Sequence, residues 1–510
     1  MPSISSPATV VVVGAGPTGL WLAAELATAG VETVVLEKRT ERSPYARALG
    51  VMPRTLDVLA LRGVAEQLLA VGRPVPAWHF GLLEESVRFD TLDTPHPFML
   101  LLPQTVTERI LEDRARSLGV TVLTGATVTG IDETDDGVTA TYDLDGVQQS
   151  LTGALVIGTD GAQSAVRTLA GIPFEGETST AWGFIGDVRL EQPPAPGTRI
   201  VRPDGALIVA PLPDGRFRLT GWDPQHQSPD EQLDLDTLRD FARRMAGTDF
   251  GAHDPSWLSR FGNANRLAAT FRRGRVLLAG DAAHIHWPTG GLGLNAGVQD
   301  AMSLGWRAAG VVQGTLPDSA LDDYAAERRS YGEALRTSTL TQSALIVAAD
   351  PAALAIRATF NRLLATNEGN RAIGTWLAGL SPESTLPSAR VVRANRDLGD
   401  LSSRSLSGLF VDAQPVVLVT DPALHATISN ALDLASDRIV VALVEAEVPD
   451  SLPAVMVFRP DGVVEWASSD DVIAAPLNAA LRNVGALDTS AVPDRLTRPF
   501  TTGRHVVVTD

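Results

Sequence analysis

The sequence predicts an α/β fold that carries a strand-rich insertion and ends in a second, smaller α/β domain. Three observations support this prediction: a strand–loop–helix–strand unit at the N-terminus, a group of short strands between Phe184 and Gly221, and a renewed alternation of strands and helices from Gln414. The 510 residues are enough for several domains of roughly 100–200 residues each.

The composition excludes several classes of function. The chain has no cysteine, which rules out disulfides, Cys-ligated zinc, iron–sulfur clusters and thiol catalysis, and we predict no metal site. The formal net charge is −18, Lys38 is the only lysine, and no basic stretch is present, so nucleic acid is a poor partner. No apolar run reaches the roughly 18 residues of a membrane span, and the N-terminus lacks the pattern of a signal peptide. We therefore expect a soluble, cytoplasmic protein without membrane contact.

The N-terminal unit is the most specific local pattern. An apolar strand at Thr9–Val13 leads directly into the glycine-rich loop Gly14–Gly19. A helix at Leu20–Ala29 follows, and a second strand at Glu32–Leu36 ends at the acidic residue Glu37. The GxGxxG pattern thus lies in the βαβ context that a Rossmann-like, dinucleotide-binding fold requires.

Each glycine of this loop has a physical role. Gly14 permits the tight turn, Gly16 lets the backbone approach a pyrophosphate, and Gly19 lets the helix pack closely on the strand. The helix N-terminus offers free N–H groups to phosphates, and Glu37, about 20 residues on, can accept hydrogen bonds from ribose hydroxyls. The pattern predicts a bound dinucleotide without separating NAD from FAD.

The segments after this unit alternate between helical and strand-rich composition. A helical stretch runs from Arg47 to about Ala70, and another helix is predicted at Pro103–Arg116. Strands are predicted at Val120–Thr124, Thr127–Ile131, Val138–Tyr142 and Leu155–Ile157, in the insertion at Phe184–Leu190, Arg199–Val201, Leu207–Pro211 and Phe217–Gly221, and then at Arg275–Ala279. Such an insertion between Rossmann segments suits a substrate domain.

The last third of the chain has its own pattern. Composition becomes Ala- and Leu-rich after about Asp350, and Pro382–Ser388 and Asp397–Gly408 have the composition of a linker. The final domain is predicted to contain strands at Val416–Thr420, Ile439–Val444, Ala454–Phe458 and Val463–Trp466 and a helix at Ala423–Leu434. Because this domain has no thiol chemistry, we expect it to pack against the first domain or across a subunit interface.

Two further motifs select the cofactor. Val156–Arg167 contains an Asp-Gly pair at Asp160, Gly274–His284 contains a Gly-Asp pair at Asp281, and Pro288–Ala301 continues into a glycine-rich loop and a helix. Together with the first loop, they resemble the three ordered motifs of the class A FAD-dependent aromatic hydroxylases, the p-hydroxybenzoate hydroxylase-like family. The chain resembles in particular the subfamily that acts on aromatic polyketides, and its last domain resembles the thioredoxin-like domain of those enzymes.

The resemblance implies a domain layout. The expected domains are an FAD-binding domain of residues 1–75, 103–170 and 271–345, a β-rich substrate-binding domain of residues 76–102 and 171–270, a helical segment and linker at 346–395, and a thioredoxin-like domain without cysteines at 396–510.

The resemblance also implies that FAD is bound non-covalently, that NADPH or NADH visits as a transient co-substrate, and that O2 is consumed. The implied cofactor-binding residues are Gly14, Gly16, Pro17, Thr18, Gly19, Glu37, Lys38, Arg47, Gln104, Asp160, Asp281, Pro288, Gly291, Gly293, Leu294 and Asn295.

Physical reasoning supports the same placement of the third motif. Asp281 directly follows an apolar strand, at the carboxyl edge of a sheet where ligands bind. The glycines at 290, 291 and 293 let backbone lie close to a flat ring, and a helix starting near Gly293 would aim its positive end at an anionic reduced flavin. The family often has other residues at Trp287, Leu292 and Ser303, which leaves the substrate-side contacts open.

The implied reaction is hydroxylation of a polycyclic aromatic substrate through a flavin C4a-hydroperoxide. Candidate residues at the substrate are Trp287, His286, Pro288, Trp222 and Trp78, each tryptophan serving either as an aromatic wall or as core packing. No general base can be assigned; the local histidines are His79, His226, His284 and His286, of which His284 is expected to form a structural hydrogen bond. Two alternatives stay open, Baeyer–Villiger oxygenation of a polycyclic ketone and an FAD-binding non-oxygenase such as a dehydrogenase or cyclase. A homodimer also stays open.

Overall fold

The computed structural model describes residues 9–135, 137–228, 230–380, 391–394, 406–432, 438–444, 453–469 and 474–487. Its largest sheet has six strands in the order β20-β21-β12-β1-β2-β8, and all neighbours are parallel except the edge pair β20 and β21. The strands of this sheet are β1 (Val10–Val13), β2 (Thr33–Glu37), β8 (Thr121–Thr124), β12 (Leu155–Gly158), β20 (Arg272–Arg273) and β21 (Val276–Leu278).

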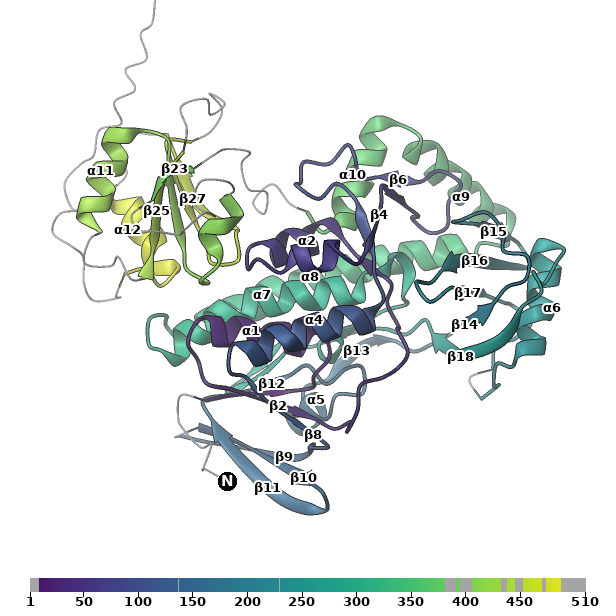
Figure 1. The fold of residues 1–510 in the computed structure, drawn as a ribbon, viewed down its shortest axis with the longest axis horizontal. Helices are drawn as coiled ribbons and strands as arrows, with labels where there is room; N and C mark the ends of the chain where they lie inside the picture. Colours follow the sequence, from purple (N-terminus) through teal and green to yellow (C-terminus); the bar gives the residue numbers. More distant parts are fainter. Residues whose placement is uncertain are drawn as a thin grey trace, which may run out of the picture.

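The main sheet is covered on both faces, as parallel sheets require (Figure 1). Three helices cover one face: α1 (Pro17–Thr28), α4 (Gln104–Ser117) and α7 (Gly293–Val312). A three-stranded antiparallel sheet of β9 (Thr127–Thr134), β10 (Gly137–Leu144) and β11 (Val147–Gly153) covers the other. All four residues of β1 are buried, so the central strand is apolar on both sides.

The inserted segment forms a separate antiparallel sheet. Its strand order is β15-β16-β17-β14-β18, with bounds β14 (Trp182–Arg189), β15 (Arg199–Arg202), β16 (Gly205–Pro211), β17 (Phe217–Trp222) and β18 (His253–Gly262). Helix α6 (Leu235–Ala246) packs on this sheet through Leu238, Phe241 and Met245. Asp234 caps the start of α6 by accepting from Thr237 N at 2.8 Å, and Gly247 ends it with a positive φ of 77°.

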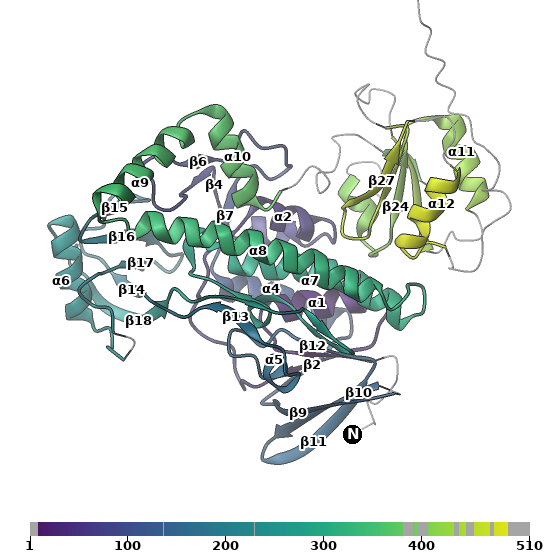
Figure 2. The ribbon, with the colours of Figure 1, turned by 180° about the vertical axis from the view of Figure 1, so that it is seen from behind.

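Three helices link this sheet back to the six-stranded sheet and the elements that cover it, which we call the first domain (Figure 2). They are α8 (Ala320–Ile346), α9 (Pro351–Leu364) and α10 (Asn367–Ala378). The shorter elements are α2 (Pro53–Ala60), α3 (Ala65–Leu69), α5 (Ala165–Leu169), β3 (Gly50–Val51), β4 (Arg73–Val75), β5 (Ala77–Trp78), β6 (Val87–Arg88), β7 (Met99–Leu101), β13 (Phe174–Glu177), β19 (Asn265–Ala268) and β22 (His284–Ile285). Within the ranges that the structure describes, no single helix has the length and hydropathy of a membrane span; only α8 and α9 together do, as a pair bent by 117°.

The C-terminal strands form a mixed five-stranded sheet in the order β23-β25-β24-β26-β27. Its elements are β23 (Val391–Ala394), β24 (Val416–Val419), α11 (Pro422–Ala431), β25 (Val440–Val444), β26 (Val455–Phe458), β27 (Val464–Ser468) and α12 (Ala474–Asn483). Alternate residues serve two cores: Val417 and Val457 pack with α11 and α12, whereas Leu418 and Phe458 join the core of the first domain. The expected packing of this domain against the first one is therefore present within the chain.

Two predictions from the sequence are corrected. The helical stretch expected from Arg47 to about Ala70 is instead strand β3 followed by α2 and α3, because Pro53 fits only a first helical turn and Gly63, with a φ of 69°, separates the two helices. The C-terminal sheet also begins before residue 396, since β23 lies in the segment predicted as linker and pairs with β25. Most of the predicted linker at 382–388 and 397–408 lies outside the described residues.

Candidate functional site

The parallel strands bring the three sequence motifs to one edge of the main sheet. The glycine loop follows β1, Glu37 ends β2, Asp160 follows β12 by two residues, and Asp281 follows β21 by three. Because the carboxyl ends of parallel strands meet at the same edge, residues far apart in sequence share one crevice.

The three glycines of the first loop have different surroundings. Gly14 has a φ of +105°, and a Cβ there would lie 2.6 Å from the carbonyl oxygen of Thr159. A Cβ on Gly19 would lie 2.0 Å from the carbonyl oxygen of Gly14, so strand and helix are in close contact. A Cβ on Gly16 would meet nothing within 4 Å. The backbone at Gly16, just before Pro17 and the N-terminus of α1, is therefore the open surface of the loop.

The carboxylate of Glu37 faces this loop. Its Oε2 accepts from Ala15 N at 2.7 Å and its Oε1 from Arg39 N at 2.9 Å. Lys38, the next residue, is exposed. Glu37 thus connects the end of β2 to the glycine loop and keeps further acceptor capacity for a ligand hydroxyl.

Gln104 and Arg47 lie near the same edge of the main sheet. Gln104 begins α4; its Oε1 accepts from Ala48 N at 3.1 Å, and its Nε2 donates to Glu108 at 2.7 Å. Gln104 therefore holds the residue next to Arg47, whose own side chain is exposed.

Asp160 has a structural task that the motif alone does not reveal. Its Oδ2 accepts from Ala165 N at 2.7 Å and Val166 N at 3.1 Å, and its Oδ1 accepts from the Ser164 hydroxyl. The carboxylate therefore caps α5. Arg167 in the same helix donates to the carbonyl oxygen of Ala282 at 2.8 Å and so joins the second motif to the third.

Asp281 is exposed at the tip of a tightly held loop. No described residue donates a hydrogen bond to its carboxylate. The loop beside it is fixed by the buried carboxylate of Asp300, whose Oδ2 accepts from Gly280 N at 2.9 Å and from His284 Nε2 at 2.7 Å. His284 thus forms the structural hydrogen bond expected of it.

Helix α7 begins at the glycine-rich loop, as the sequence predicts. Asn295 in its first turn accepts from Met52 N at 2.7 Å and donates to the carbonyl oxygens of Gly50 and Gly291 at 3.0 and 2.8 Å. Asn295 is itself buried, while Pro288 is exposed and Gly291, Gly293 and Leu294 are half-buried.

The geometry of these loops fits an extended dinucleotide such as FAD. A Cβ on Gly16 or on Gly291 would meet no atom within 4 Å, so open backbone lies at both loops. The Thr18 side chain joins α1 to the third motif and to α7, with its Oγ1 2.6 Å from a Cβ built on Gly280 and 2.1 Å from one built on Gly297. The exposed carboxylate of Asp281 lies between the N-termini of α1 and α7. A helix N-terminus can bind a phosphate, and the carboxylate can accept hydrogen bonds from the hydroxyl groups of the same ligand.

His286 and Trp287 come directly before the glycine-rich loop Pro288–Gly293, which we call the flavin loop. A Cβ on Gly293 would lie 3.6 Å from His286 Nε2 and 3.8 Å from Asp281 Oδ1, so these three residues are neighbours. Burial lowers the pKa of His286, and its Nδ1 lies 2.7 Å from the Trp287 carbonyl oxygen. Such an imidazole is neutral at pH 7.

Trp287 is buried in a small apolar cluster with Leu82, Ala206 and Ile346, and Trp222 packs against this cluster. The Phe261 ring lies 6.4 Å from the Trp287 ring. The cluster joins the flavin loop to the inserted sheet. The Nε1 atom of Trp222 is buried there without a hydrogen-bond partner.

Trp78 and His226, which were also candidates for the substrate site, lie outside this cluster. Trp78 packs against a second cluster that contains Met52 and Phe80, and its ring lies 5.0 Å from that of His79. His226 is held by Glu231 in a polar group beneath α6. The structure therefore brings Trp222 and Trp287 together and places Trp78 and His226 in separate surroundings.

Sequence reasoning assigned no role to Asp300, Arg328 or Arg167, which hold the loops in place. Arg328 Nε lies 2.6 Å from Asp300 Oδ1. One signal was available: Asp300 is the one charged residue in the first half of α7, Gly293–Met302. Its partner on α8 cannot be identified from spacing.

Known proteins resemble the chain over nearly its whole length. Residues 7–339 match the family model described as FAD binding domain. An aromatic compound monooxygenase from Bacillus subtilis (strain 168), YhjG, whose name includes the word uncharacterized, is 39% identical over 90% of this chain and 93% of its own. The structure of the anhydrotetracycline hydroxylase OxyS from Streptomyces rimosus superposes with a TM-score of 0.83 at 33% identity, over 94% of this chain and 99% of that one.

A third relative bears a different kind of name. The dialkyldecalin synthase of Streptomyces rugosporus is 34% identical over 92% of this chain and 98% of its own length. Its name describes no oxygen transfer.

Proposed function

Because this chain belongs to the FAD-binding domain family and is a class A flavin-dependent monooxygenase, we propose that it hydroxylates a polycyclic aromatic molecule of the polyketide type. NAD(P)H would supply the electrons and O2 the oxygen atom. The balanced reaction converts NAD(P)H, a proton, O2 and an aromatic C–H group into NAD(P)+, water and a phenol.

When bound, FAD supplies the redox chemistry, accepting a hydride and activating O2. The residues proposed to hold it are those of the sheet edge. The loop at Gly14–Gly19 and the start of α1 would bind the pyrophosphate, Glu37 the adenosine ribose, and Asp281 the ribityl chain. The N-terminus of α7 would stabilise negative charge on the reduced ring, by up to about 2 kcal/mol.

One observation supports the proposal most directly: the apolar cluster of Trp287 and Trp222 lies between the flavin loop and the inserted sheet. Large aromatic side chains beside a flavin suit a flat, polycyclic substrate. We propose that the inserted sheet is the substrate-binding domain. The buried Nε1 of Trp222 then donates a hydrogen bond to a substrate oxygen.

Two domain assignments belong to the same proposal. The segments around the six-stranded sheet form the FAD-binding domain, and the mixed C-terminal sheet with α11 and α12 is a thioredoxin-like domain. The chain has no cysteine, so this last domain serves packing and not thiol exchange.

Baeyer–Villiger oxygenation and a cofactor-assisted cyclisation are the competing reactions. The cyclisation is favoured by one observation, the likeness to a dialkyldecalin synthase. No general base is needed for either alternative, whereas hydroxylation of a phenol benefits from one. We propose His286, a neutral imidazole beside the flavin loop, as the proton acceptor; burial lowers its pKa and so weakens it as a base.

Product analysis under 18O2 separates these reactions. Purified protein, NADPH and a panel of polycyclic phenols, quinones and ketones are incubated together, and the products are examined by mass spectrometry. Hydroxylation places one 18O atom in a new hydroxyl group. One 18O atom in a ring-expanded ester indicates Baeyer–Villiger oxygenation instead, and an unlabelled isomer of the substrate indicates a cyclase; either result overturns the proposal.

A further inference from the structure

The turn between β26 and β27 reaches into the first domain. Its residues are Arg459, Pro460, Asp461 and Gly462, and the last three are buried. A Cβ on Gly462, where φ is +75°, would lie 2.8 Å from Leu61 Cδ1 next to α2. Only glycine fits so close a contact in this conformation.

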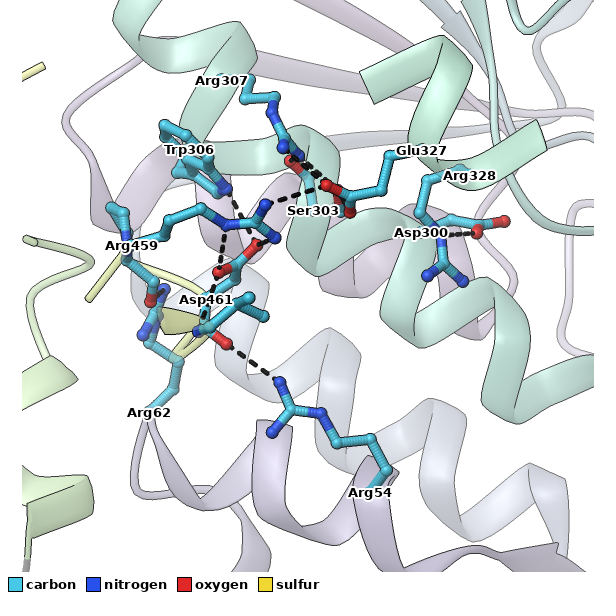
Figure 3. A network of polar contacts seen from close by, with 12 residues as sticks. Arg54, Arg62, Asp300, Ser303, Trp306, Arg307, Glu327, Arg328, Arg459 and Asp461 are labelled. Carbon is cyan, nitrogen blue, oxygen red and sulfur yellow. Dashed lines mark hydrogen bonds and ion pairs between the residues drawn. The ribbon is translucent and has the colours of Figure 1, made fainter. Parts of the chain in front are cut away.

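Asp461 is the centre of a set of contacts with two helices of the first domain, α2 and α7 (Figure 3). Its Oδ2 accepts from Arg459 Nη2 at 2.6 Å and from Trp306 Nε1, on α7, at 3.2 Å. Its backbone carbonyl accepts from Arg54 Nη2, on α2, at 3.2 Å. A neighbouring arginine, Arg62, donates to the carbonyl oxygen of Pro460 at 3.1 Å. The turn is thus bonded to α2 and α7 through charge-assisted hydrogen bonds.

Arg459 extends the contacts to α8. Its Nη1 lies 2.9 Å from Glu327 Oε2, which also accepts from Arg307 Nη2 at 2.8 Å, while Oε1 accepts from the Ser303 hydroxyl at 2.8 Å. Burial opposes the charge of Glu327, yet Arg307 and Arg459 lower its pKa to about 2. A carboxylate from α8 is thus held between one arginine of the C-terminal turn and one of α7.

The same helices also carry contacts that fix the loops of the proposed FAD site. Arg328, next to Glu327, pairs with Asp300, and Asp300 accepts from Gly280 N beside Asp281. On α2, Arg54 is two residues from Met52, whose N–H donates to Asn295 in the first turn of α7. Two contacts of the turn, those with Arg54 and Glu327, are therefore one or two residues from a contact that fixes the proposed cofactor site.

We propose that the turn of Arg459 to Gly462 is a positioning element for FAD: it fixes α2, α7 and α8 relative to one another and so holds the flavin loop in its binding geometry. Arg459 and Asp461 are positioning residues in this account and touch no cofactor. The inference rests on the proposed placement of FAD. Because coupling between two sites is reciprocal, FAD in turn tightens the docking of the turn.

This reciprocity can be measured without a substitution. Hydrogen–deuterium exchange of the full chain is compared with and without FAD, for peptides covering β26, the turn and β27 and, as the control, for peptides covering α12. We expect the turn to exchange at least several-fold faster without FAD, and α12 to exchange at the same rate in both. Equal exchange at the turn in both forms overturns the inference.

A pair of variants gives the second test. Asp461→Asn removes the charge that Arg459 and Trp306 contact, whereas Leu477→Ala damages the C-terminal core on the far face of the sheet. We expect Asp461→Asn to raise the Kd of FAD about tenfold, a usual coupling between sites. Leu477→Ala should lower the Tm and leave the Kd within twofold. Equal Kd values for both variants and the parent contradict the inference.

A third variant separates this inference from the site itself. If Asp281→Ala also fails to change FAD binding, the proposed site is wrong. If Asp281→Ala weakens binding and Asp461→Asn does not, the site stands and only the positioning role of the turn fails.

Discussion

Arg328 and Asp300 form a buried ion pair in which Nε lies 2.6 Å from Oδ1. The other carboxylate oxygen accepts from Gly280 and His284, so one aspartate joins α8, α7 and the loop that carries Asp281. Burial by itself would raise the pKa of Asp300, but Arg328 and His284 lower it to about 2. The carboxylate is ionised at every pH at which the enzyme would work.

Replacing Asp300 by Asn should therefore destabilise the protein strongly. The substitution leaves the buried Arg328 without its counter-charge, which typically costs about 3–5 kcal/mol. Urea unfolding of the FAD-loaded protein measures this. The control is Asp318→Asn, which breaks an ion pair between Arg272 and an exposed aspartate and should cost about 1 kcal/mol or less. An equal decrease in the free energy of unfolding in both variants would show that the buried Asp300 pair stabilises the fold no more than an exposed pair does.

Asp281→Ala should weaken FAD binding without unfolding the chain. The side chain is exposed and accepts no hydrogen bond from the described residues, so its loss leaves no buried group unpaired. Loss of one charged hydrogen bond to the cofactor, about 1.5–3 kcal/mol, corresponds to a Kd that rises roughly ten- to hundredfold. Quenching of flavin fluorescence measures the Kd. Asp323→Ala, at an exposed position of α8, is the matched control and should bind FAD as the parent does. A variant with full flavin content and unchanged Kd would refute the assignment.

Trp222→Phe tests the proposed substrate contact. The indole nitrogen is buried without a partner, so its removal should not lower the free energy of unfolding. If a substrate oxygen accepts from it, the KM should rise about tenfold, as loss of one hydrogen bond of roughly 1.4 kcal/mol predicts. The same substitution at Trp466 in the C-terminal sheet should leave the KM unchanged. An unchanged KM in Trp222→Phe places the substrate elsewhere.

His79 predicts a pH dependence of stability. Burial, followed by the nearby charge of Arg199, lowers its pKa to about 3. In the unfolded chain this histidine binds a proton near pH 6.5, whereas in the folded chain it stays neutral down to about pH 3. The free energy of unfolding is therefore largest above pH 6.5 and falls as the pH drops from 6.5 towards 3. One such proton changes the free energy of unfolding by about 1.4 kcal/mol per pH unit.

The measurement compares the parent with His79→Leu between pH 6.5 and 5. The variant should lose that slope, whereas Leu83→Ala, which removes a buried neighbour without a titrating group, should lower stability equally at each pH. A parallel pH dependence in the parent and in His79→Leu would count against a buried neutral imidazole.

The sequence was most informative where function depends on contiguous residues. The turn at Gly14, the close packing at Gly19, the position of Glu37 and the start of α7 at Gly293 all follow from local backbone requirements. The contacts that hold the site could not be predicted, because they join residues distant in sequence. Asp300 and Arg328 are 28 positions apart, and Trp306 and Asp461 are 155 apart. Such pairs depend on how helices and domains pack, which no spacing encodes.

The split of the predicted helix after Arg47 has a similar cause. Local propensity favoured a helical stretch from Arg47, but Met52 N is bonded to Asn295 of α7, which fixes an extended chain just before Pro53. The aromatic candidates could not be placed from the sequence either. Composition did not predict that Trp287 and Trp222 share one cluster while Trp78 packs against another.

The most direct test of the central claim is the stoichiometry of turnover. NADPH oxidation, O2 uptake and hydrogen peroxide are followed together, with and without a polycyclic phenol that the product screen identifies. A monooxygenase with a gated flavin should oxidise NADPH slowly alone and much faster with substrate, consuming one O2 per NADPH and releasing little peroxide. Rapid NADPH oxidation that does not depend on substrate and returns all the oxygen as peroxide would contradict the account and identify an oxidase.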